Sequence, residues 1–181
     1  MIETPRLVLR EWRDDDRDWN AAECACPVVM EHLGGVQDRA ASDARIDRMI
    51  ALQAARGHGF WVIERKADGA RIGAAGLKLV DADGAPMQGT LEIGWRLARA
   101  AWGHGYAFEA ATASLDFAFD RLAAPRVVAL TSRRNAASWR LMERLGMRYR
   151  PDLDYDDARF AAIDNPTILY VIEPAGRPRS R

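Results

Sequence analysis

Strict alternation of hydrophobic and polar residues over positions 90 to 97 predicts a β-strand with one buried face. The buried face is expected to hold Leu91, Ile93, Trp95 and Leu97. The opposite face carries Thr90, Glu92, Gly94 and Arg96. Shorter runs of strand-forming residues predict further strands at Arg6–Trp12, Phe60–Glu64, Arg71–Val80, Val127–Leu130, Met147–Arg150 and Thr167–Ile172.

Segments with helical periodicity lie between these strands. The aspartates at positions 14 to 16 suit the first turn of a helix that ends near Cys26, because acidic groups favour the positive end of the helix dipole. We interpret this charge run as a helix start, with a metal site as the alternative. Further helices are predicted at Ser42–Arg56, Ala107–Leu122 and Ala136–Leu145, and a short apolar piece at Val28–Leu33. Asn135 is the expected N-cap of the last helix.

The order of these elements predicts the α/β class. We expect one mixed, mostly antiparallel central sheet flanked by helices, with a single crossover in its middle. Residues 1–173 are expected to form this single domain. Pro174, Gly176 and Pro178 disfavour regular structure, so residues 174–181 are expected to be a disordered basic tail. The basic residues of this tail are Arg177, Arg179 and Arg181.

Composition and charge narrow the class of protein. The 181 residues hold 26 Lys and Arg against 26 Asp and Glu, so the basic excess typical of nucleic-acid binders is missing. Cys24 and Cys26 make a poor disulfide pair and an incomplete metal site, so we expect neither. No apolar run is long enough for a membrane span, and the first residues do not read as a secretory signal. We therefore expect a cytoplasmic protein without a metal, a nucleic-acid partner or a membrane partner.

The segment after the alternating strand carries the clearest chemical signal. Gly103 and Gly105 allow a tight turn and a close approach of the backbone to a ligand, and a helix begins directly after them. The first amides of a helix lack internal acceptors and point outward at the positive end of its dipole. Residues 103–107 therefore predict a binding site for an anion, with a plain turn as the alternative. The Walker loop and the dinucleotide fingerprint are excluded, since Gly-Lys-Ser/Thr is absent and Phe108 replaces the third glycine.

A set of ordered motifs surrounds this loop. They are Glu92-Ile93-Gly94-Trp95-Arg96-Leu97, Trp102-Gly103-His104-Gly105-Tyr106-Ala107, Glu109-Ala110, Asn135, Ser138 and Leu145-Gly146-Met147. Together they resemble the GNAT acetyltransferases, and within them the branch of the ribosomal-protein N-terminal acetyltransferases. The resemblance covers nearly the whole chain. One position departs from the wider superfamily, which tends to carry Arg or Gln where this chain has Ala100.

The resemblance implies a site for acetyl-CoA as co-substrate. The alternating strand would splay from its neighbour, and free backbone groups of Trp95, Arg96, Leu97 and Ala98 would bind the pantetheine arm. The amides of Gly103, His104, Gly105, Tyr106 and Ala107 would hold the pyrophosphate. The side chain of Asn135 would hold the cofactor arm, although Asn is also simply a good helix cap.

The resemblance also implies the catalytic groups. Acyl transfer from a thioester to an amine needs a proton acceptor, a donor to the oxyanion and a group at the leaving sulfur. Glu92 is the candidate base, with a cross-strand ion pair as the alternative. A backbone amide near Leu97 is the candidate oxyanion donor. Ser138 is the candidate at the sulfur, where relatives often use Tyr. His104 is a weaker candidate base, because it lies on the phosphate loop.

We therefore expect an N-acetyltransferase that moves an acetyl group to a primary amine by direct attack on the thioester. The acceptor would be a protein N-terminus or a small-molecule amine, and the protein a monomer or homodimer. The alternative is a non-catalytic acyl-CoA-binding regulatory domain.

Overall fold

A computed structural model describes residues 1–178 of the chain, and Arg179 and Arg181 lie outside the described residues. The chain divides into two compact units. The first unit consists of Met1–Gly76 and Trp95–Ala110, and the second of Leu77–Gly94 and the residues from Ala111 onward.

The strands confirm the predicted α/β class. Their hydrogen-bonded order is β1-β2-β3-β4-β5-β6-β8-β7. The pairs β1–β2, β2–β3, β3–β4, β6–β8 and β7–β8 are antiparallel, and β5–β6 is parallel. The strands are β1 (Ile2–Glu3), β2 (Leu7–Arg10), β3 (Phe60–Arg65), β4 (Ala70–Leu79), β5 (Leu91–Leu97), β6 (Val127–Ser132), β7 (Arg148–Tyr149) and β8 (Thr167–Ile172).

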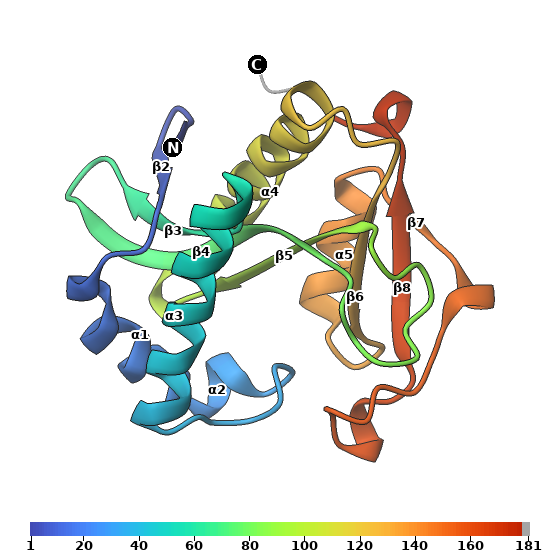
Figure 1. The fold of residues 1–181 in the computed structure, drawn as a ribbon, viewed down its shortest axis with the longest axis horizontal. Helices are drawn as coiled ribbons and strands as arrows, with labels where there is room; N and C mark the ends of the chain where they lie inside the picture. Colours follow the sequence, from blue (N-terminus) through green and yellow to red (C-terminus); the bar gives the residue numbers. More distant parts are fainter. Residues whose placement is uncertain (179–181) are drawn as a thin grey trace. The chain divides into compact units, whose positions relative to one another are not determined.

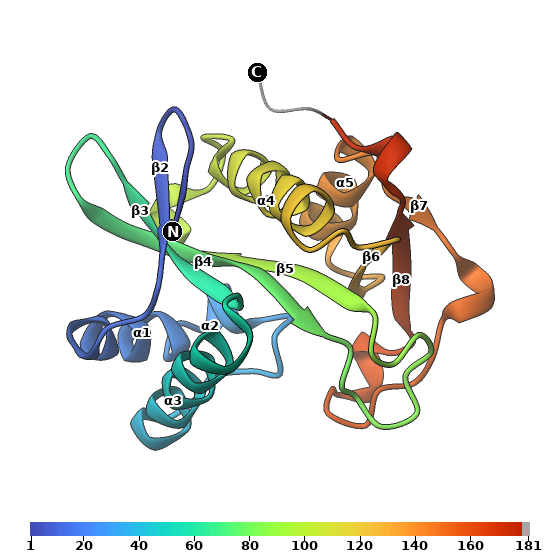
Figure 2. The ribbon, with the colours of Figure 1, turned by 45° about the horizontal axis from the view of Figure 1, so that its top comes forward.

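The first unit packs three helices on one side of its strands (Figures 1 and 2). These helices are α1 (Arg17–Cys24), α2 (Pro27–Met30) and α3 (Arg39–Arg56). One of its hydrophobic clusters joins Trp12, Ile46, Val62 and Ala74. Helix α3 begins before the predicted Ser42, because the Asp38 side chain caps it by accepting a hydrogen bond of 2.8 Å from the Ala41 amide.

The second unit is built around β6 and β8, which pair along their whole length. Helix α5 (Ala136–Arg144) packs on β6, and its N-cap is Asn135 as predicted. Helix α4 (Tyr106–Asp116) starts in the first unit, ends in the second and continues there as a π-helical turn, Phe117–Arg121. One hydrophobic cluster of this unit joins Val80, Ala82, Ala85, Val128 and Leu169.

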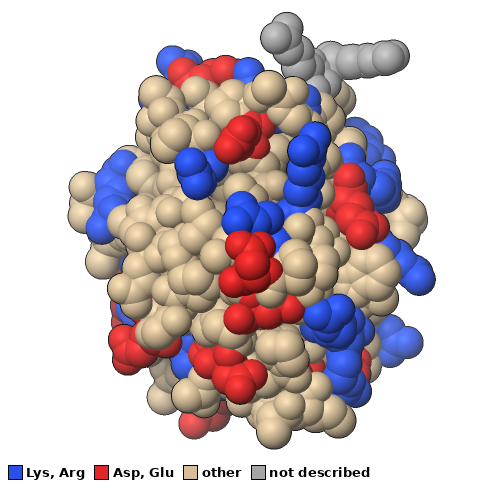
Figure 3. Space-filling model, turned by 90° about the vertical axis from the view of Figure 1, so that its right-hand side faces the viewer, with Lys and Arg blue, Asp and Glu red and all other residues tan. Residues whose placement is uncertain are grey.

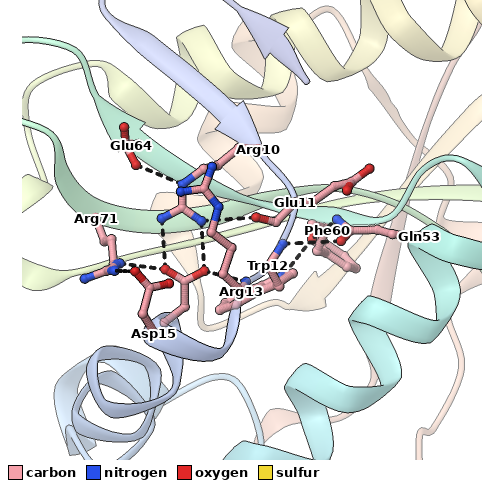
Figure 4. Close-up of polar contacts among 10 residues, drawn as sticks. Arg10, Glu11, Trp12, Arg13, Asp15, Gln53, Phe60, Glu64 and Arg71 are labelled. Carbon is pink, nitrogen blue, oxygen red and sulfur yellow. Dashed lines mark hydrogen bonds and ion pairs between the residues drawn. The ribbon is translucent and has the colours of Figure 1, made fainter.

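The aspartates at positions 14 to 16 open a 3₁₀ turn ahead of α1, so the predicted helix start is confirmed. The sequence did not predict their second role. The side chain of Asp16 is fully buried and accepts hydrogen bonds of 2.8 and 2.9 Å from Arg10 and 2.6 Å from Arg71 (Figure 4). Within residues 1–178 no group of three or more His, Cys, Asp or Glu side chains is arranged to hold a metal ion.

Residues 174–178 are the described part of the segment predicted to be a disordered tail. Pro174–Gly176 forms a 3₁₀ turn, and Arg177 makes an ion pair of 2.6 Å with Asp120. A Cβ atom at Gly146 would collide with the carbonyl oxygen of Gly176, so glycine is required for this packing.

Charges of both signs share the protein surface. On the face drawn in Figure 3, Lys and Arg side chains lie interspersed with Asp and Glu. No helix in the described part of the chain combines the length and the apolar character that a membrane span requires.

Candidate functional site

The loop before α4 presents a run of free backbone amides. Gly103 and Gly105 adopt φ angles of +80° and +78°, which favour glycine over residues with a side chain. Within residues 1–178, the amides of Gly103, His104, Gly105, Tyr106 and Ala107 have no hydrogen-bond acceptor in the protein. Residues 102–105 are exposed. Residues 103–107 therefore present free backbone donors at the start of α4, and their binding of an anion stays a prediction.

An ion pair from the first strand region fixes this loop. The guanidinium of Arg6 donates 2.6 Å to Glu109 Oε2 and 3.0 Å to the His104 carbonyl oxygen. Glu109 Oε1 also accepts from the Arg6 amide at 2.9 Å and from Thr4 Oγ1 at 2.6 Å. Burial would raise the pKa of Glu109, but these donors and the charge of Arg6 outweigh it and lower the pKa. Nothing in the sequence pattern predicted that Arg6 and Glu109 form an ion pair.

The backbone around Leu97 and Ala98 is already partly engaged. The Leu97 carbonyl oxygen accepts 2.9 Å from the Trp102 indole, and the Ala98 amide donates 2.9 Å to the Ile72 carbonyl oxygen. A Cβ at Gly73 would lie 2.5 Å from the Arg96 carbonyl oxygen, so β4 can approach β5 this closely only with glycine there. The groups predicted to bind a pantetheine arm are thus not all unpaired.

The parallel register between β5 and β6 is short. It covers Leu91↔Val127 and Glu92↔Val128, while β5 continues to Leu97. This brief pairing is what a splayed strand pair requires, because the ladder must end where the strands diverge.

The burial of Arg96 contradicts the alternation predicted for β5. It was expected on a polar face, yet its exposed fraction is only 8%. Its guanidinium donates to Cys24 Sγ at 2.8 Å and to Asn20 Oδ1, both on α1. The C-terminal part of β5 is therefore buried on both faces, because α1 and α2 cover the side that the pattern assigned to solvent.

Glu92 lies in the second unit and has the cross-strand ion pair that was the alternative to a catalytic role. Its carboxylate is 3.2 Å from Nζ of Lys78 on β4, and Lys78 also contacts Asp81 at 2.6 Å. The Glu92 side chain is 17% exposed. Burial raises the pKa of Glu92, Lys78 opposes the rise and Asp81 reinforces it. A carboxylate whose pKa is raised is a stronger base than an ordinary one, which suits the role of proton acceptor.

Asn135 and Ser138 lie together at the start of α5, also in the second unit. Asn135 Oδ1 accepts 3.2 Å from the Ser138 amide, which confirms the cap. The cap uses only the oxygen of Asn135. Across the described residues, Asn135 Nδ2 and Ser138 Oγ have no protein partner, so both remain available to a ligand.

The side chains of the three histidines make contacts of their own. His104 is exposed and stacks on Tyr106, with ring centroids 5.6 Å apart. His32 Nε2 is 3.9 Å from Glu31, and His58 Nδ1 lies 2.9 Å from the Arg56 carbonyl oxygen. Of the predicted site residues, Trp95–Ala98 and Gly103–Ala107 belong to the first unit. The second unit holds Glu92, Asn135 and Ser138.

Comparison with known proteins identifies the family. Residues 6–148 match the family described as "Acetyltransferase (GNAT) domain". A protein of Bacillus licheniformis described as "Uncharacterized N-acetyltransferase p20" is 30% identical over 165 residues, which is 89% of this chain and 90% of that protein.

Solved structures agree with this assignment. An acetyltransferase from Agrobacterium tumefaciens str. C58 superposes with a TM-score of 0.77 at 28% identity, over 95% of this chain and 93% of that one. RimL, a ribosomal L7/L12 α-N-protein acetyltransferase in complex with coenzyme A, has the same fold with a TM-score of 0.73 at 15% identity, over 94% and 95% of the two chains. The chain therefore belongs to the GNAT family and is an N-acetyltransferase.

Proposed function

We propose that the acyl donor is acetyl-CoA, that the acceptor is a primary amine, and that the amine attacks the thioester directly. One observation carries the proposal: the five consecutive free amides of Gly103–Ala107 at the N-terminus of α4. Such amides bind phosphate oxygens through hydrogen bonds and through the positive end of the helix dipole. A pyrophosphate with several acceptor oxygens matches this set of donors. The coenzyme A bound in the RimL structure supports the same choice of donor.

The rest of the cofactor would be held by one side chain of α5 and by backbone groups of β5. The Nδ2 atom of Asn135 is a free donor at the start of α5, directed by the cap that fixes its Oδ1. Backbone groups of Trp95 and Arg96 are the proposed partners of the pantetheine arm, since the neighbouring Leu97 carbonyl and Ala98 amide are engaged.

The proposed chemistry starts from a neutral amine. Its nitrogen attacks the acetyl carbon, and Glu92 accepts the proton that the nitrogen must lose, either directly or through water. A backbone amide near Leu97 would stabilise the oxyanion. The C–S bond then breaks, and Ser138 Oγ donates a hydrogen bond to the leaving thiolate. In this proposal Lys78 sets the proton affinity of Glu92, since its charge lowers the pKa that burial raises.

A polypeptide N-terminus or a small-molecule amine is the proposed acceptor. The likeness to RimL favours the first, although that likeness concerns the fold. The protein is proposed to act as a monomer or homodimer.

The test combines binding with turnover. Calorimetric titration should show acetyl-CoA binding at least tenfold more tightly than S-acetylpantetheine, which lacks the pyrophosphate. Thiol release should then depend on an added amine. Binding without release on any of a broad set of amines and peptides would favour the non-catalytic acyl-CoA-binding domain. Equal affinity for the two thioesters would contradict the role of residues 103–107.

A further inference from the structure

Arg96 is a buried cation without a carboxylate partner. Its exposed fraction is 8%, and its guanidinium contacts Asn20 Oδ1, Cys24 Sγ at 2.8 Å and Met30 Sδ at 4.0 Å. No ion pair to Arg96 is found among the described residues. Burying an ionised group is costly unless a counter-charge compensates it. The protein thus holds a positive charge in its interior and supplies no carboxylate in hydrogen-bond contact with it.

The guanidinium of Arg96 is held in one position by a chain of hydrogen bonds. Asn20 on α1 donates 2.7 Å from Nδ2 to Ser42 Oγ on α3, which turns Asn20 Oδ1 toward Arg96. The exposed fractions of Asn20 and Ser42 are 1% and 0%. Three elements of the first unit, α1, α3 and β5, therefore fix the direction of this cation before any ligand arrives.

A second unpaired arginine lies on the same side of α3. Arg45 is three residues after Ser42, so the two side chains share one face of the helix. It is half-buried, and within the described chain no hydrogen bond or ion pair engages its guanidinium. Burial lowers the pKa of Arg45, the charge of Arg96 lowers it further, and Cys24 opposes the change without reversing it. Because Asn20 links Arg96 to Ser42, and Arg45 shares the helix face of Ser42, the two cations lie on the same side of α3.

The remaining charges nearby do not neutralise this pair. Arg48 on α3 adds to the positive field at Arg45. Glu23 on α1 is a half-buried carboxyl; burial raises its pKa and the charge of Arg96 lowers it, but no ion pair joins the two. Three arginines thus face one glutamate, and the region keeps an excess of positive charge.

We propose that Arg45 and Arg96 bind a carboxylate carried by the acceptor amine. A guanidinium presents paired N–H donors that match the two oxygens of a carboxylate. Two adjacent cations that destabilise the empty protein become favourable when an anion lies between them. The acceptor would therefore be an amino acid or a peptide with an acidic group, and not a polycation such as spermidine. This inference rests on the proposed function.

The first experiment measures binding by titration, without turnover. The probes are β-alanine, L-glutamate and the dipeptide Ala-Glu, each beside its fully amidated counterpart. We expect at least one carboxylate to bind ten times or more tightly than its amide. Comparing the affinities of the amino acids with that of the dipeptide shows whether the acceptor is a small molecule or a peptide.

Substitutions in α3 test whether Arg45 causes the preference for a carboxylate over its amide. In Arg45→Met the preference for the carboxylate should fall below threefold, and Arg45→Lys should restore part of it. Arg56→Met is the control, because Arg56 is exposed at the end of the same helix and carries the same charge. Thermal unfolding of each variant verifies that it folds. A carboxylate preference that survives in Arg45→Met overturns the inference.

The result separates this inference from the proposed function. If acetyl-CoA binds but no carboxylate is preferred over its amide, or spermidine is preferred, the inference fails and the proposed function stands. If acetyl-CoA does not bind, the proposed function fails, and the carboxylate titrations still decide whether Arg45 and Arg96 form an anion site.

Discussion

Two buried arginines in the first unit differ in what surrounds them. Arg10 is paired on both sides: it contacts Asp16 at 2.8 Å and Glu64 at 2.8 Å (Figure 4). Arg96 is buried to a similar degree, with exposed fractions of 5% for Arg10 and 8% for Arg96. Its partners are an amide oxygen and sulfur atoms. Arg45, which interacts electrostatically with it, has no ion pair among the described residues either.

The difference separates a charge that serves the fold from one that serves a ligand. At Arg10 the carboxylates are built into the protein, so each charge is neutralised when the chain folds. At Arg96 the counter-charge is missing from the protein, and folding must bear the repulsion of Arg45 and Arg96. Natural sequences keep such destabilising groups where function requires them.

Replacing Asp16 by Asn should have the largest effect on stability. The change leaves Arg10 buried without its main counter-charge, which costs about 3–5 kcal/mol in the free energy of unfolding. Urea denaturation measures the loss. Asp15→Asn is the control, because the Asp15 side chain is 63% exposed in its ion pair with Arg71, and its loss should stay below about 1 kcal/mol.

The ion pair of Arg10 and Asp16 also predicts how the free energy of unfolding changes at acidic pH. Burial would raise the pKa of Asp16, but the hydrogen bonds and charge of Arg10 prevail and lower it. The carboxylate therefore adds stability above its unfolded pKa of about 3.9, and this contribution is lost as the pH falls through the lowered folded value. In Asp16→Asn the curve of stability against pH should be flatter below pH ~4. An unchanged curve would contradict the assignment.

Glu92 extends the comparison to a buried acid with one cationic partner. Glu92→Gln should lower kcat by about 10²-fold, the usual contribution of a general base, and leave acetyl-CoA affinity unchanged. Lys78→Met removes the charge that lowers the pKa of Glu92, so the acid limb of kcat/KM should move to higher pH. Asp81→Asn removes a charge that raises it and should move the limb to lower pH. A limb that stays in place in both variants would exclude Glu92 as the base.

Arg96→Met should destabilise the protein less than Asp16→Asn does. No carboxylate is left unpaired, and the cost is the orphaned Asn20 oxygen, about 1–3 kcal/mol. Both variants should be measured in the same urea series. A loss for Arg96→Met as large as that for Asp16→Asn would show that Arg96 is a structural charge like Arg10.

Arg45→Met should have the smallest effect on stability. It removes a partly desolvated cation and its repulsion with Arg96, so the free energy of unfolding should stay within about 1 kcal/mol of the wild-type value or rise above it. Thermal and urea unfolding both report this. A clear loss of stability would mean that Arg45 supports the fold, and the comparison between the two arginines would fail.

Features that depend on neighbouring residues were predictable from the sequence. Hydrogen bonds and ion pairs between residues far apart in the chain were not. The free amides of residues 103–107 follow from two glycines and a helix start, and the Asn135 cap depends on residues within one turn. The strand predicted at residues 90–97 is observed as Leu91–Leu97, one residue shorter at its start.

The burial of Arg96 was missed because alternation assigns one face of a strand to solvent, and only the tertiary packing of α1 and α2 covers that face. The pairing of Asp16 was missed for the same reason. One of its partners, Arg71, lies on the distant strand β4.

The most direct test of the account is a calorimetric titration of acetyl-CoA into wild type, Ala107→Ser and Ala107→Pro. Proline is tolerated in the first turn of a helix and removes one of the five free amides, while serine keeps it. A hydrogen bond to a charged phosphate contributes about 1.5–3 kcal/mol, so Ala107→Pro should bind roughly 10- to 100-fold more weakly and Ala107→Ser like wild type. Equal affinity in all three proteins, with α4 intact by circular dichroism, would contradict the claim that these amides hold the cofactor.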